Sequence, residues 1–218
     1  MHVTAIIAAG GRGQRLGDAR PKQLLALDGR TLLERSVEAF LAHPSIDEVV
    51  VALPPDVARN PPPYLRGAVK PLRVVAGGAR RQDSVANAFA AAAAASDLIV
   101  IHDAARPFAS ADLIARTIAA AAESGAALAA VQARDTVKHV DGGRFVLSTL
   151  SRETIYLAQT PQAFRREVLQ AALALTADAT DEAALAERAG HRVREPRPPP
   201  VKAHQPGEPS QPLEATHR

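Results

Sequence analysis

The first residues of the chain that could do chemistry form a glycine-rich turn close to the amino terminus. The apolar, β-prone run at 3–8 leads into Ala9-Gly10-Gly11-Arg12-Gly13-Gln14-Arg15, and Lys22 follows one short segment later. Glycines let backbone N–H groups approach an anion closely, while arginine and lysine supply the charge that a triphosphate needs. The pattern predicts a cradle for nucleotide phosphates, with Arg15 and Lys22 as its cations.

Two better-known phosphate-binding motifs do not fit this turn. A P-loop requires Gly-Lys followed by Ser or Thr, whereas Gly13 is followed by Gln14 and Arg15. A dinucleotide-binding fingerprint requires a third glycine against the helix and an acidic residue after the next strand, and the spacing here fits poorly. Taken alone, the turn is explained equally well by an ordinary surface loop.

Further polar motifs begin where other predicted strands end. Strands at 72–76, 98–101 and 126–131 are followed by Gly77-Gly78-Ala79-Arg80-Arg81, by His102-Asp103-Ala104-Ala105-Arg106 and by Arg134-Asp135-Thr136-Val137-Lys138. Ligands of an open parallel sheet bind beyond the carboxyl ends of its strands. Because these motifs share that edge with the glycine-rich turn, we expect them to form a single site.

The elements that must position these motifs alternate between strand and helix. The apolar spacing also predicts a strand at 47–53 and helices at 31–42, 82–95, 111–124, 164–175 and 181–189. The strand at 98–101 is apolar on both faces and is expected to be central. The chain is therefore predicted to be a doubly wound α/β domain with a mostly parallel sheet.

The alternation is interrupted at 134–160, where two alternating runs flank Asp141-Gly142-Gly143. This pattern indicates a β-hairpin, which is marginally stable alone, so we expect an arm that contacts a second subunit in a homodimer. The stretch at 192–218 is rich in proline and polar residues and has no hydrophobic period. We expect it to be a disordered or extended tail after a domain at 1–191.

Composition excludes several classes of function. The 218 residues contain no cysteine, which rules out disulfides, thiolate metal sites and a cysteine nucleophile. The net charge is only +3 and aromatic residues make up 3%, so we expect no nucleic-acid partner. We find no apolar run of membrane-spanning length and no secretory leader, and we expect a cytoplasmic protein that does not bind a membrane.

In their order and spacing, the motifs resemble the 2-C-methyl-D-erythritol 4-phosphate cytidylyltransferase family. The matching stretches are 9–16, 21–23, 77–85, 102–107, 135–138, 159–164 and 180–182. The resemblance covers roughly residues 3–190 and implies a Rossmann-like nucleotidyltransferase fold. The pair His-Asp-Ala-Ala-Arg-Pro and Gln-Thr-Pro-Gln-Ala-Phe is specific, whereas the glycine-rich turn marks only the wider sugar nucleotidyltransferase-like superfamily.

The resemblance implies a magnesium-dependent reaction of the non-mevalonate isoprenoid pathway. CTP would transfer its cytidylyl group to 2-C-methyl-D-erythritol 4-phosphate, with release of pyrophosphate. The attacking phosphate monoester is already anionic, so the reaction needs no general base. The obstacle is repulsion between two anions, which cations around the α-phosphate relieve.

The resemblance also implies roles for individual residues. Arg15 and Lys22 would be catalytic, because they bind the CTP phosphates. The nucleotide would be contacted by Ala8, Ala9, Gly10, Gly11, Gly13, Gly78, Ala79, Ser84, Asp103 and Ala104, with Gly78 and Ser84 at the cytosine edge. The acceptor would be bound by Asp103, Arg106, Thr136, Arg152 and Thr160, some of them from the partner's arm, and Asp103 would lie near Mg²⁺.

Simpler structural roles are open for several of these residues. Asp103 and Arg106 could form an ion-paired turn, His102 could be purely structural, and Ser84 could be a helix cap. The stretch at 180–182 could be only the start of a helix, and Lys138 and Arg134 could be solvated.

The carboxyl-terminal sequence departs from the family pattern after Val193, and Lys202 stands in a different context from the family's substrate-binding lysine. Codons for 202–211, read one base out of register, can spell Lys-Leu-Thr-Ser-Pro-Glu-Asn-Leu-Ala, the family's ending. We therefore hypothesise a frameshift between about residues 192 and 202.

Two other functions are open: transfer to another polyol phosphate such as ribitol phosphate, and nucleotide binding with catalysis impaired by the altered ending.

Overall fold

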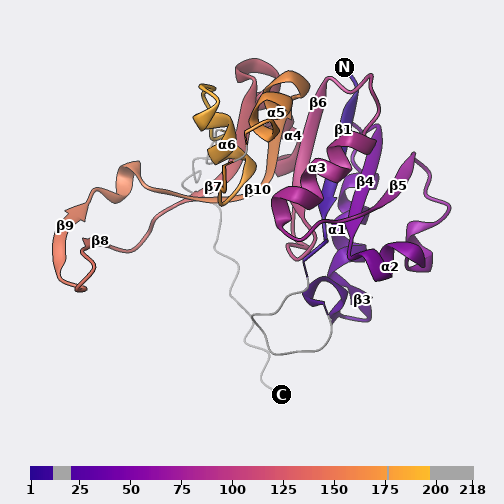
Figure 1. Ribbon diagram of the computed structural model, residues 1–218, viewed down its shortest axis with the longest axis horizontal. Coiled ribbons are helices and arrows are strands. Elements are labelled where there is room, and N and C mark those ends of the chain that lie inside the picture. Colours follow the sequence, from indigo (N-terminus) through magenta and orange to yellow (C-terminus); the bar gives the residue numbers. More distant parts are fainter. Residues whose placement is uncertain (12–20, 176, 197–218) are drawn as a thin grey trace, which may run out of the picture.

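A six-stranded sheet forms the centre of the molecule (Figure 1). The computed structural model describes residues 1–11, 21–175 and 177–196. In spatial order the strands are β5 (Leu72–Ala76), β4 (Glu48–Leu53), β1 (Val3–Ala8), β6 (Leu98–Asp103), β10 (Tyr156–Arg165) and β7 (Ala126–Gln132). Only β10 runs antiparallel to its neighbours. The predicted mostly parallel sheet is confirmed, and β6 lies next to β1 in its centre.

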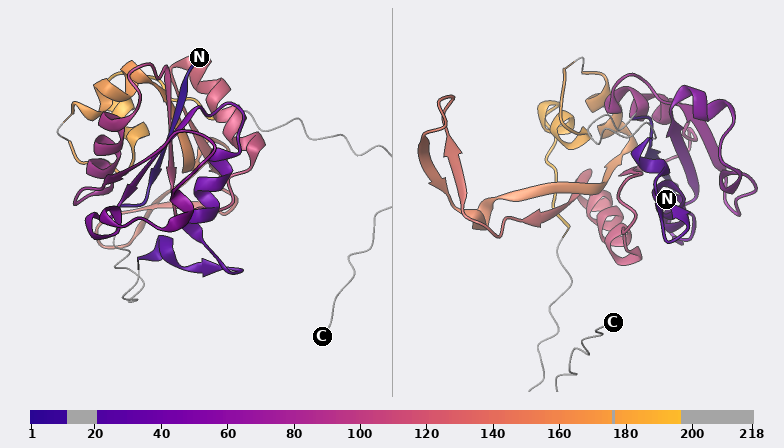
Figure 2. Two further views of the ribbon diagram at one scale, coloured as in Figure 1. Left: turned by 90° about the vertical axis from the view of Figure 1, so that its right-hand side faces the viewer. Right: turned by 90° about the horizontal axis from the view of Figure 1, so that it is seen from below.

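Helices cover both faces of the sheet (Figure 2). One face packs against α1 (Leu32–Leu41) and α4 (Ala111–Ser124), and the other against α3 (Arg81–Ala91), α5 (Arg166–Leu173) and α6 (Glu182–Arg188). Alternate side chains of each strand enter different cores, so Ile7 lies in the first core and Ile6 in the second. The predicted doubly wound arrangement is confirmed. None of the described helices has both the length and the apolar character of a membrane span.

Two predicted helix boundaries are wrong, and sheet contacts explain both. The helix predicted at 82–95 ends at Ala91, because Ala92 is extended and the N–H of Ala93 donates to the buried Glu48 carboxylate at 2.9 Å. The helix predicted from residue 164 begins only at Arg166. Phe164 belongs to β10, where it pairs with strands on both sides and is fully buried.

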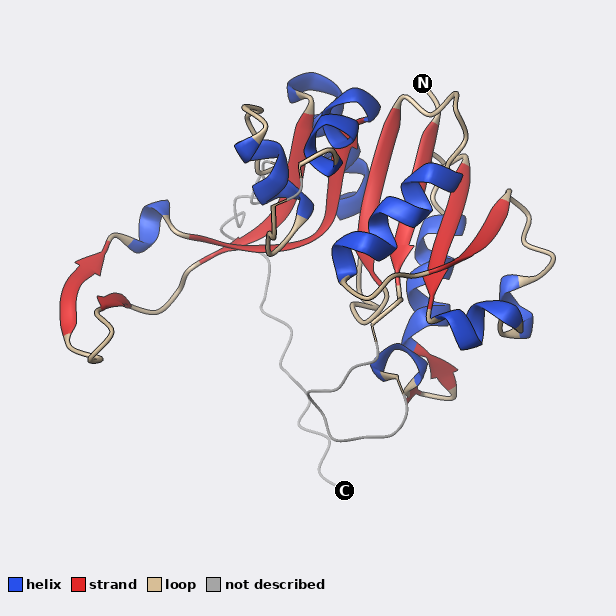
Figure 3. Cartoon of the chain, in the orientation of Figure 1, coloured by secondary structure: helices blue, strands red, loops and turns tan. Residues whose placement is uncertain are grey.

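The segment at 134–160 forms an arm that projects from the domain in Figure 1 and in the right-hand view of Figure 2. Its tip is the hairpin of β8 (Val137–Val140) and β9 (Val146–Leu150), followed by the 3-10 turn η4 (Arg152–Thr154). The ends of β7 and β10 pair with each other to form its base (Figure 3). The predicted hairpin is therefore present, and two long strands of the central sheet carry it.

Smaller elements complete the fold. The 3-10 turn η2 (Lys22–Leu24) precedes a ribbon of β2 (Ala26–Leu27) and β3 (Arg30–Thr31), while α2 (Pro55–Arg59) and η3 (Pro63–Leu65) follow β4. Beyond the predicted boundary at 191, Arg194 pairs in parallel with Ala127 of β7. Its N–H donates to Ala126 O and its carbonyl accepts from Leu128 N, both at 2.9 Å. The predicted tail from residue 197 onward lies outside the described residues.

Candidate active site

The loops that follow β1 and β5 are in direct contact through their glycines. A Cβ atom on Gly10 would lie 2.4 Å from Ser84 Oγ, and one on Gly77 would lie 2.9 Å from the Cα of Gly10. Both loops continue the strand pairing, because the N–H of Ala9 donates to Ala52 O at 2.9 Å and that of Gly77 to Leu53 O at 2.7 Å. The two predicted binding loops can therefore pack this closely only because residues 10 and 77 have no side chain.

Replacing Gly10 by alanine tests this contact. We expect the variant to lose about 1–3 kcal/mol of unfolding free energy, because the added methyl group has to displace buried Ser84. Gly11→Ala is the matched control, since none of the described residues has an atom within 4 Å of the position that its methyl group would take. Urea denaturation of both variants measures the difference, and equal midpoints would show that the two loops are not in contact.

Ser84 is buried at the start of α3. Its hydroxyl donates to Arg80 O and accepts from the N–H of Gly78, each at 3.1 Å. The interpretation of Ser84 as a helix cap is wrong, because Arg80 occupies the N-cap position and Asp83 Oδ2 accepts the N–H of Arg80 at 3.0 Å. Ser84 instead fixes the loop that holds Gly78, next to the exposed Ala79.

Gln23 connects the segment of Lys22 to the glycine-rich turn. Its side-chain amide is buried and donates to Ala9 O at 2.6 Å and to Gly11 O at 3.0 Å. Lys22, the adjacent residue in η2, is exposed. Gln23 belongs to one of the motifs but was not predicted to have a role; its position directly after the candidate lysine is the signal that points to it. Arg15 and Gly13 lie outside the described residues.

Asp103 ends β6 at the same edge of the sheet and lies between two arginines. Its Oδ1 accepts from Arg81 Nε at 2.8 Å, and its Oδ2 lies 3.4 Å from Arg106 Nε. Since the N–H of Arg106 also donates to Asp103 O at 3.0 Å, these residues do form an ion-paired turn. Ala104 is buried below this turn, and its N–H donates to Ala8 O at 3.1 Å.

His102 and Thr160 form a buried support beneath Asp103. His102 Nε2 lies 2.8 Å from Arg106 O, which can only accept, so Nε2 carries the proton. Nδ1 therefore accepts from the Thr160 hydroxyl at 3.0 Å, and that hydroxyl accepts the N–H of Asp103 at 3.3 Å. Burial lowers the pKa of His102 to about 4. The neutral ring thus positions the Asp103 turn, in agreement with the structural interpretation.

The buried histidine makes stability depend on pH. The pKa of His102 is about 4 in the folded chain and has its ordinary value of 6.5 in an unfolded one, so the unfolded chain binds more protons between these values. We expect the free energy of unfolding to fall by about 3 kcal/mol as the pH drops from 6.5 to 4. Chemical denaturation of His102→Gln should lack this component, and an identical pH dependence in both proteins would refute it.

Helix α6 is anchored next to the site by polar contacts. Its N-cap Asp181 accepts the N–H of Ala184 at 2.9 Å, which confirms the predicted helix start. Gln162 of β10 donates to Asp181 Oδ2 at 2.9 Å and accepts the N–H of Ala183 at 3.2 Å. Glu182, the first helical residue, forms an ion pair with Arg81 at 2.6 Å. This pair was not predicted from the sequence, because its two residues lie 101 positions apart.

The arm residues do not join this group within one chain. Thr136 and Arg152 are exposed on the projecting arm, where Arg152 Nη1 donates to Arg134 O at 2.7 Å (Figure 1). Lys138 is exposed as well, and its ammonium donates to Thr149 Oγ1 across the hairpin at 2.6 Å. The structure brings together Gly10, Gly78, Ser84, Asp103, Arg106 and Thr160, and leaves Thr136 and Arg152 apart from them.

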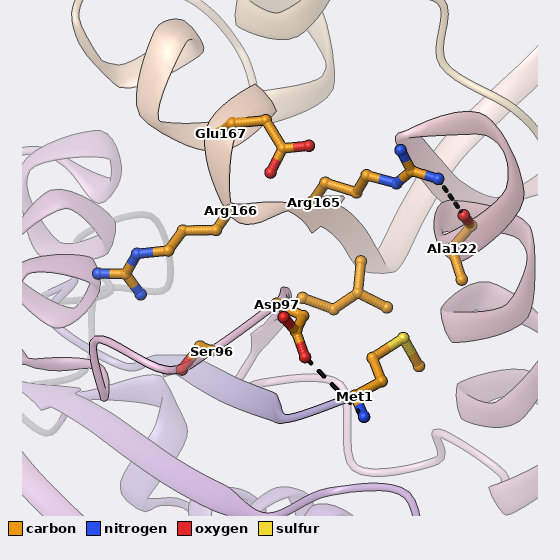
Figure 4. A pocket seen from close by; sticks show the side chains of 8 residues that line it. Met1, Ser96, Asp97, Ala122, Arg165, Arg166 and Glu167 are labelled. Atoms are coloured by element: carbon orange, nitrogen blue, oxygen red, sulfur yellow. Dashed lines mark hydrogen bonds and ion pairs between the residues drawn. The ribbon is translucent and has the colours of Figure 1, made fainter.

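A hollow at the opposite edge of the sheet is formed by other residues (Figure 4). It has a volume of about 470 Å³, and its lining includes Met1, Asp97, Arg165, Arg166 and Glu167. The arginines here are engaged with the protein: Arg165 donates to Ala122 O at 2.6 Å and Arg166 to Ala93 O at 2.9 Å. None of the predicted phosphate-binding loops, as far as the structure describes them, lines this hollow.

Comparison with known proteins gives a consistent result. The sequence profile of the family described as 2-C-methyl-D-erythritol 4-phosphate cytidylyltransferase matches residues 3–195. A protein of that name from Geobacter metallireducens is 44% identical over 205 residues, covering 89% of this chain and 88% of the relative. The bifunctional enzyme IspD/IspF of Anaeromyxobacter dehalogenans is 50% identical over 198 residues, covering 88% of this chain. The chain spans about half the length of that relative.

Solved structures share the fold. The crystal structure of 2-C-methyl-D-erythritol 4-phosphate cytidylyltransferase from Thermus thermophilus is 37% identical, with a TM-score of 0.73 and 90% of each chain covered. That of 4-diphosphocytidyl-2C-methyl-D-erythritol synthase from Anaerococcus prevotii has a TM-score of 0.80 at 29% identity, covering 89% and 87%. With its motifs gathered at one sheet edge, the chain belongs to the 2-C-methyl-D-erythritol 4-phosphate cytidylyltransferase family, which consists of nucleotidyltransferase enzymes.

Proposed function

We propose that this chain transfers the cytidylyl group of CTP to 2-C-methyl-D-erythritol 4-phosphate and releases pyrophosphate. The observation that carries the proposal is the convergence, at one sheet edge, of the Gly10 turn, the Gly78–Ser84 loop and the Asp103 turn. In a chain of this family, these three loops would bind the two phosphorylated substrates. Transfer to ribitol phosphate has no comparable support. The cytoplasmic location and the absence of nucleic-acid and membrane partners stay predictions from the sequence.

The base would be recognised at the loop held by Ser84. The buried Ser84 hydroxyl donates to Arg80 O and accepts the N–H of Gly78, and so holds the loop in place. A cytosine amino group donates to a backbone carbonyl of this loop, whereas the corresponding carbonyl of uracil cannot. We assign the choice of cytosine to this loop, with backbone contacts from Gly78 and Ala79.

The phosphates would be bound by the Gly10 turn together with Lys22 and Arg15. Gln23 holds the carbonyls of Ala9 and Gly11, which keeps the segment of Lys22 against the turn. The acceptor phosphate attacks as an anion, so the chain has only to lower the repulsion and stabilise charge at the α-phosphate. His102 is not needed as a base, in keeping with its burial and lowered pKa.

We propose that a magnesium ion would bind at Asp103, whose Oδ2 has only a long contact of 3.4 Å with Arg106 Nε. Mg²⁺ commonly binds through one or two carboxylates and the substrate's own phosphates. Within the described part of the chain there is no cluster of three or more carboxylate, histidine or cysteine ligands, so a single carboxylate at the sheet edge has to suffice. Asp103 would hold the ion together with the phosphates of CTP. When bound, the ion neutralises phosphate charge, while Arg106 and Thr160 orient the acceptor.

The arm would complete the site of a partner subunit in a homodimer. Thr136 directly precedes β8 and Arg152 begins η4, so both lie on the arm that projects from the domain in Figure 1. An exchanged arm would bring them to the partner's sheet edge. Large apolar side chains are exposed along the arm, at Val140, Phe145, Val146, Leu147, Leu150, Tyr156 and Leu157. An exposed apolar surface of this kind is typical of an interface between subunits.

Pyrophosphate release tests the proposed reaction. We expect release when the protein, CTP, Mg²⁺ and methylerythritol phosphate are combined, and much slower release with ribitol phosphate. CTP binding without release would favour the alternative of a nucleotide-binding protein impaired in catalysis.

Sequencing the DNA for residues 192–218 and weighing the intact protein test the frameshift, because an unshifted gene excludes it.

A further inference from the structure

Arg81 is held between two carboxylates that come from different elements. It is the first residue of α3, and its Nε donates to Asp103 Oδ1 at 2.8 Å, while its Nη1 donates to Glu182 Oε2 at 2.6 Å. Asp103 ends β6 and Glu182 begins α6. One planar guanidinium therefore connects the candidate site to a helix that contributes no predicted substrate contact.

The ion pair between Arg81 and Glu182 is largely buried, unlike an ordinary surface salt bridge. Glu182 is 1% exposed, and the remaining nitrogen of Arg81, Nη2, is buried without a hydrogen-bond partner in the described residues. Burial raises the pKa of Glu182, an effect that the charge of Arg81 opposes. The contacts of Asp181 with Gln162 and Ala184 fix the start of α6, and with it the backbone that carries Glu182.

The two oxygens of Asp103 are consequently unequal. Oδ1 has a short bond to a guanidinium that Glu182 fixes, whereas Oδ2 lies 3.4 Å from Arg106, beyond the usual hydrogen-bond length. Arg106 is exposed. Its Nη1 also donates to Gln159 Oε1, a contact that is itself exposed, so Arg106 can leave Oδ2 without breaking a buried contact.

From this asymmetry, which matters only if the proposed reaction is right, we infer that Arg81 and Glu182 are positioning residues. They hold Asp103 Oδ1 so that Oδ2 stays directed toward the substrates, and they thereby free Arg106 to bind the acceptor phosphate. Without the pair, Asp103 would turn toward Arg106 and neutralise it.

The Arg81–Glu182 pair could have a merely structural role, which would be to join α3 to α6. Replacing both residues separates this structural role from the proposed positioning of Asp103. Exchange of a buried ion pair for apolar residues of similar size is commonly tolerated by the fold. We therefore expect the double variant Arg81→Met/Glu182→Leu to unfold near the parent temperature. Its kcat should fall by about 100-fold, because Asp103 is misplaced. A stable double variant with parental kcat would overturn the inference.

Two further variants keep the test decisive. Arg73→Met is the matched control, because Arg73 forms an ion pair at 2.9 Å with Glu48, which is 2% exposed at the amino edge of the sheet. It should leave kcat unchanged. Arg81→Lys keeps the charge beside Glu182 but lacks the second donor arm for Asp103. If the double variant fails to fold, Arg81→Lys carries the test: a parental kcat overturns the inference, and a kcat reduced about tenfold or more supports it.

The parent protein separates failure of this inference from failure of the proposed function. If the parent releases no pyrophosphate, the proposed reaction is wrong. If the parent is active and the Arg81 variants match it, only the positioning role is wrong. A crystal structure of the double variant adds a readout independent of turnover, because we expect Asp103 to be turned toward Arg106.

Discussion

Replacement of Lys22 by alanine is expected to lower kcat by about 10³-fold while the fold stays intact. The ammonium would lie where negative charge develops between the α-phosphate and the leaving pyrophosphate, and loss of one such group commonly costs this much. Lys22 is exposed at the surface of η2, and buried Gln23 keeps that segment in place. Steady-state kinetics of pyrophosphate release, with circular dichroism to check the fold, measure the effect.

Lys70→Ala is the matched control for this experiment. Lys70 donates to His43 O at 2.5 Å, just before β5 and away from the carboxyl edge, so its removal should leave kcat unchanged. A Lys22→Ala enzyme with near-parental turnover would remove Lys22 from the catalytic machinery. The same prediction holds for Arg15→Ala, which tests a residue outside the described part of the chain.

Mixing two inactive variants is expected to restore activity. If each site takes Lys22 from one chain and Arg152 from the arm of the other, Lys22→Ala and Arg152→Ala homodimers are both inactive. Exchange of subunits then gives mixed dimers with one intact and one doubly altered site. Random exchange of equal amounts should restore about one quarter of parental activity, since half of the dimers are mixed and each has one active site.

The geometry of a single chain makes this a strict test. Were Arg152 to act on its own sheet edge, every site in a mixed dimer would lack one group, and mixing would restore nothing. A mixture of Lys22→Ala with Asp103→Ala is the control, because both residues belong to the same edge of one chain in either arrangement. Every site in that mixture lacks one group, so it should stay inactive, and recovery in the first mixture alone shows that the arms are exchanged.

Local patterns were sufficient to predict most of the fold. Apolar β-branched runs predicted β1, β4 and β6, and helical spacing of apolar residues predicted α1 and α4. The structure confirms these elements. The predicted start of α5 at residue 164 is wrong, because the apolar Phe164 is compatible with a strand as well as with a helix. Pairing of β10 with β6 and β7 places Phe164 in a strand, and a local sequence pattern cannot predict such long-range pairing.

The candidate site shows the same limit. Gly10 and Gly78 were predicted because glycine-rich turns after strands have a recognisable spacing, and Ser84 because of the family resemblance. The structure brings these residues together. The Arg81–Glu182 pair connects α3 to α6 across the fold, so no spacing predicts it. The proposed contact between the arm and another subunit would likewise depend on a surface that only a second chain supplies.

The central claim is that both substrates meet at the carboxyl edge of the sheet. A crystal structure of the protein with CTP and Mg²⁺ tests this most directly. We expect the triphosphate against Gly10, Gly11 and Lys22 and the cytosine beside Gly78 and Ser84. CTP bound instead in the hollow formed by Met1, Arg165 and Arg166, or with its triphosphate remote from Lys22, would contradict the account.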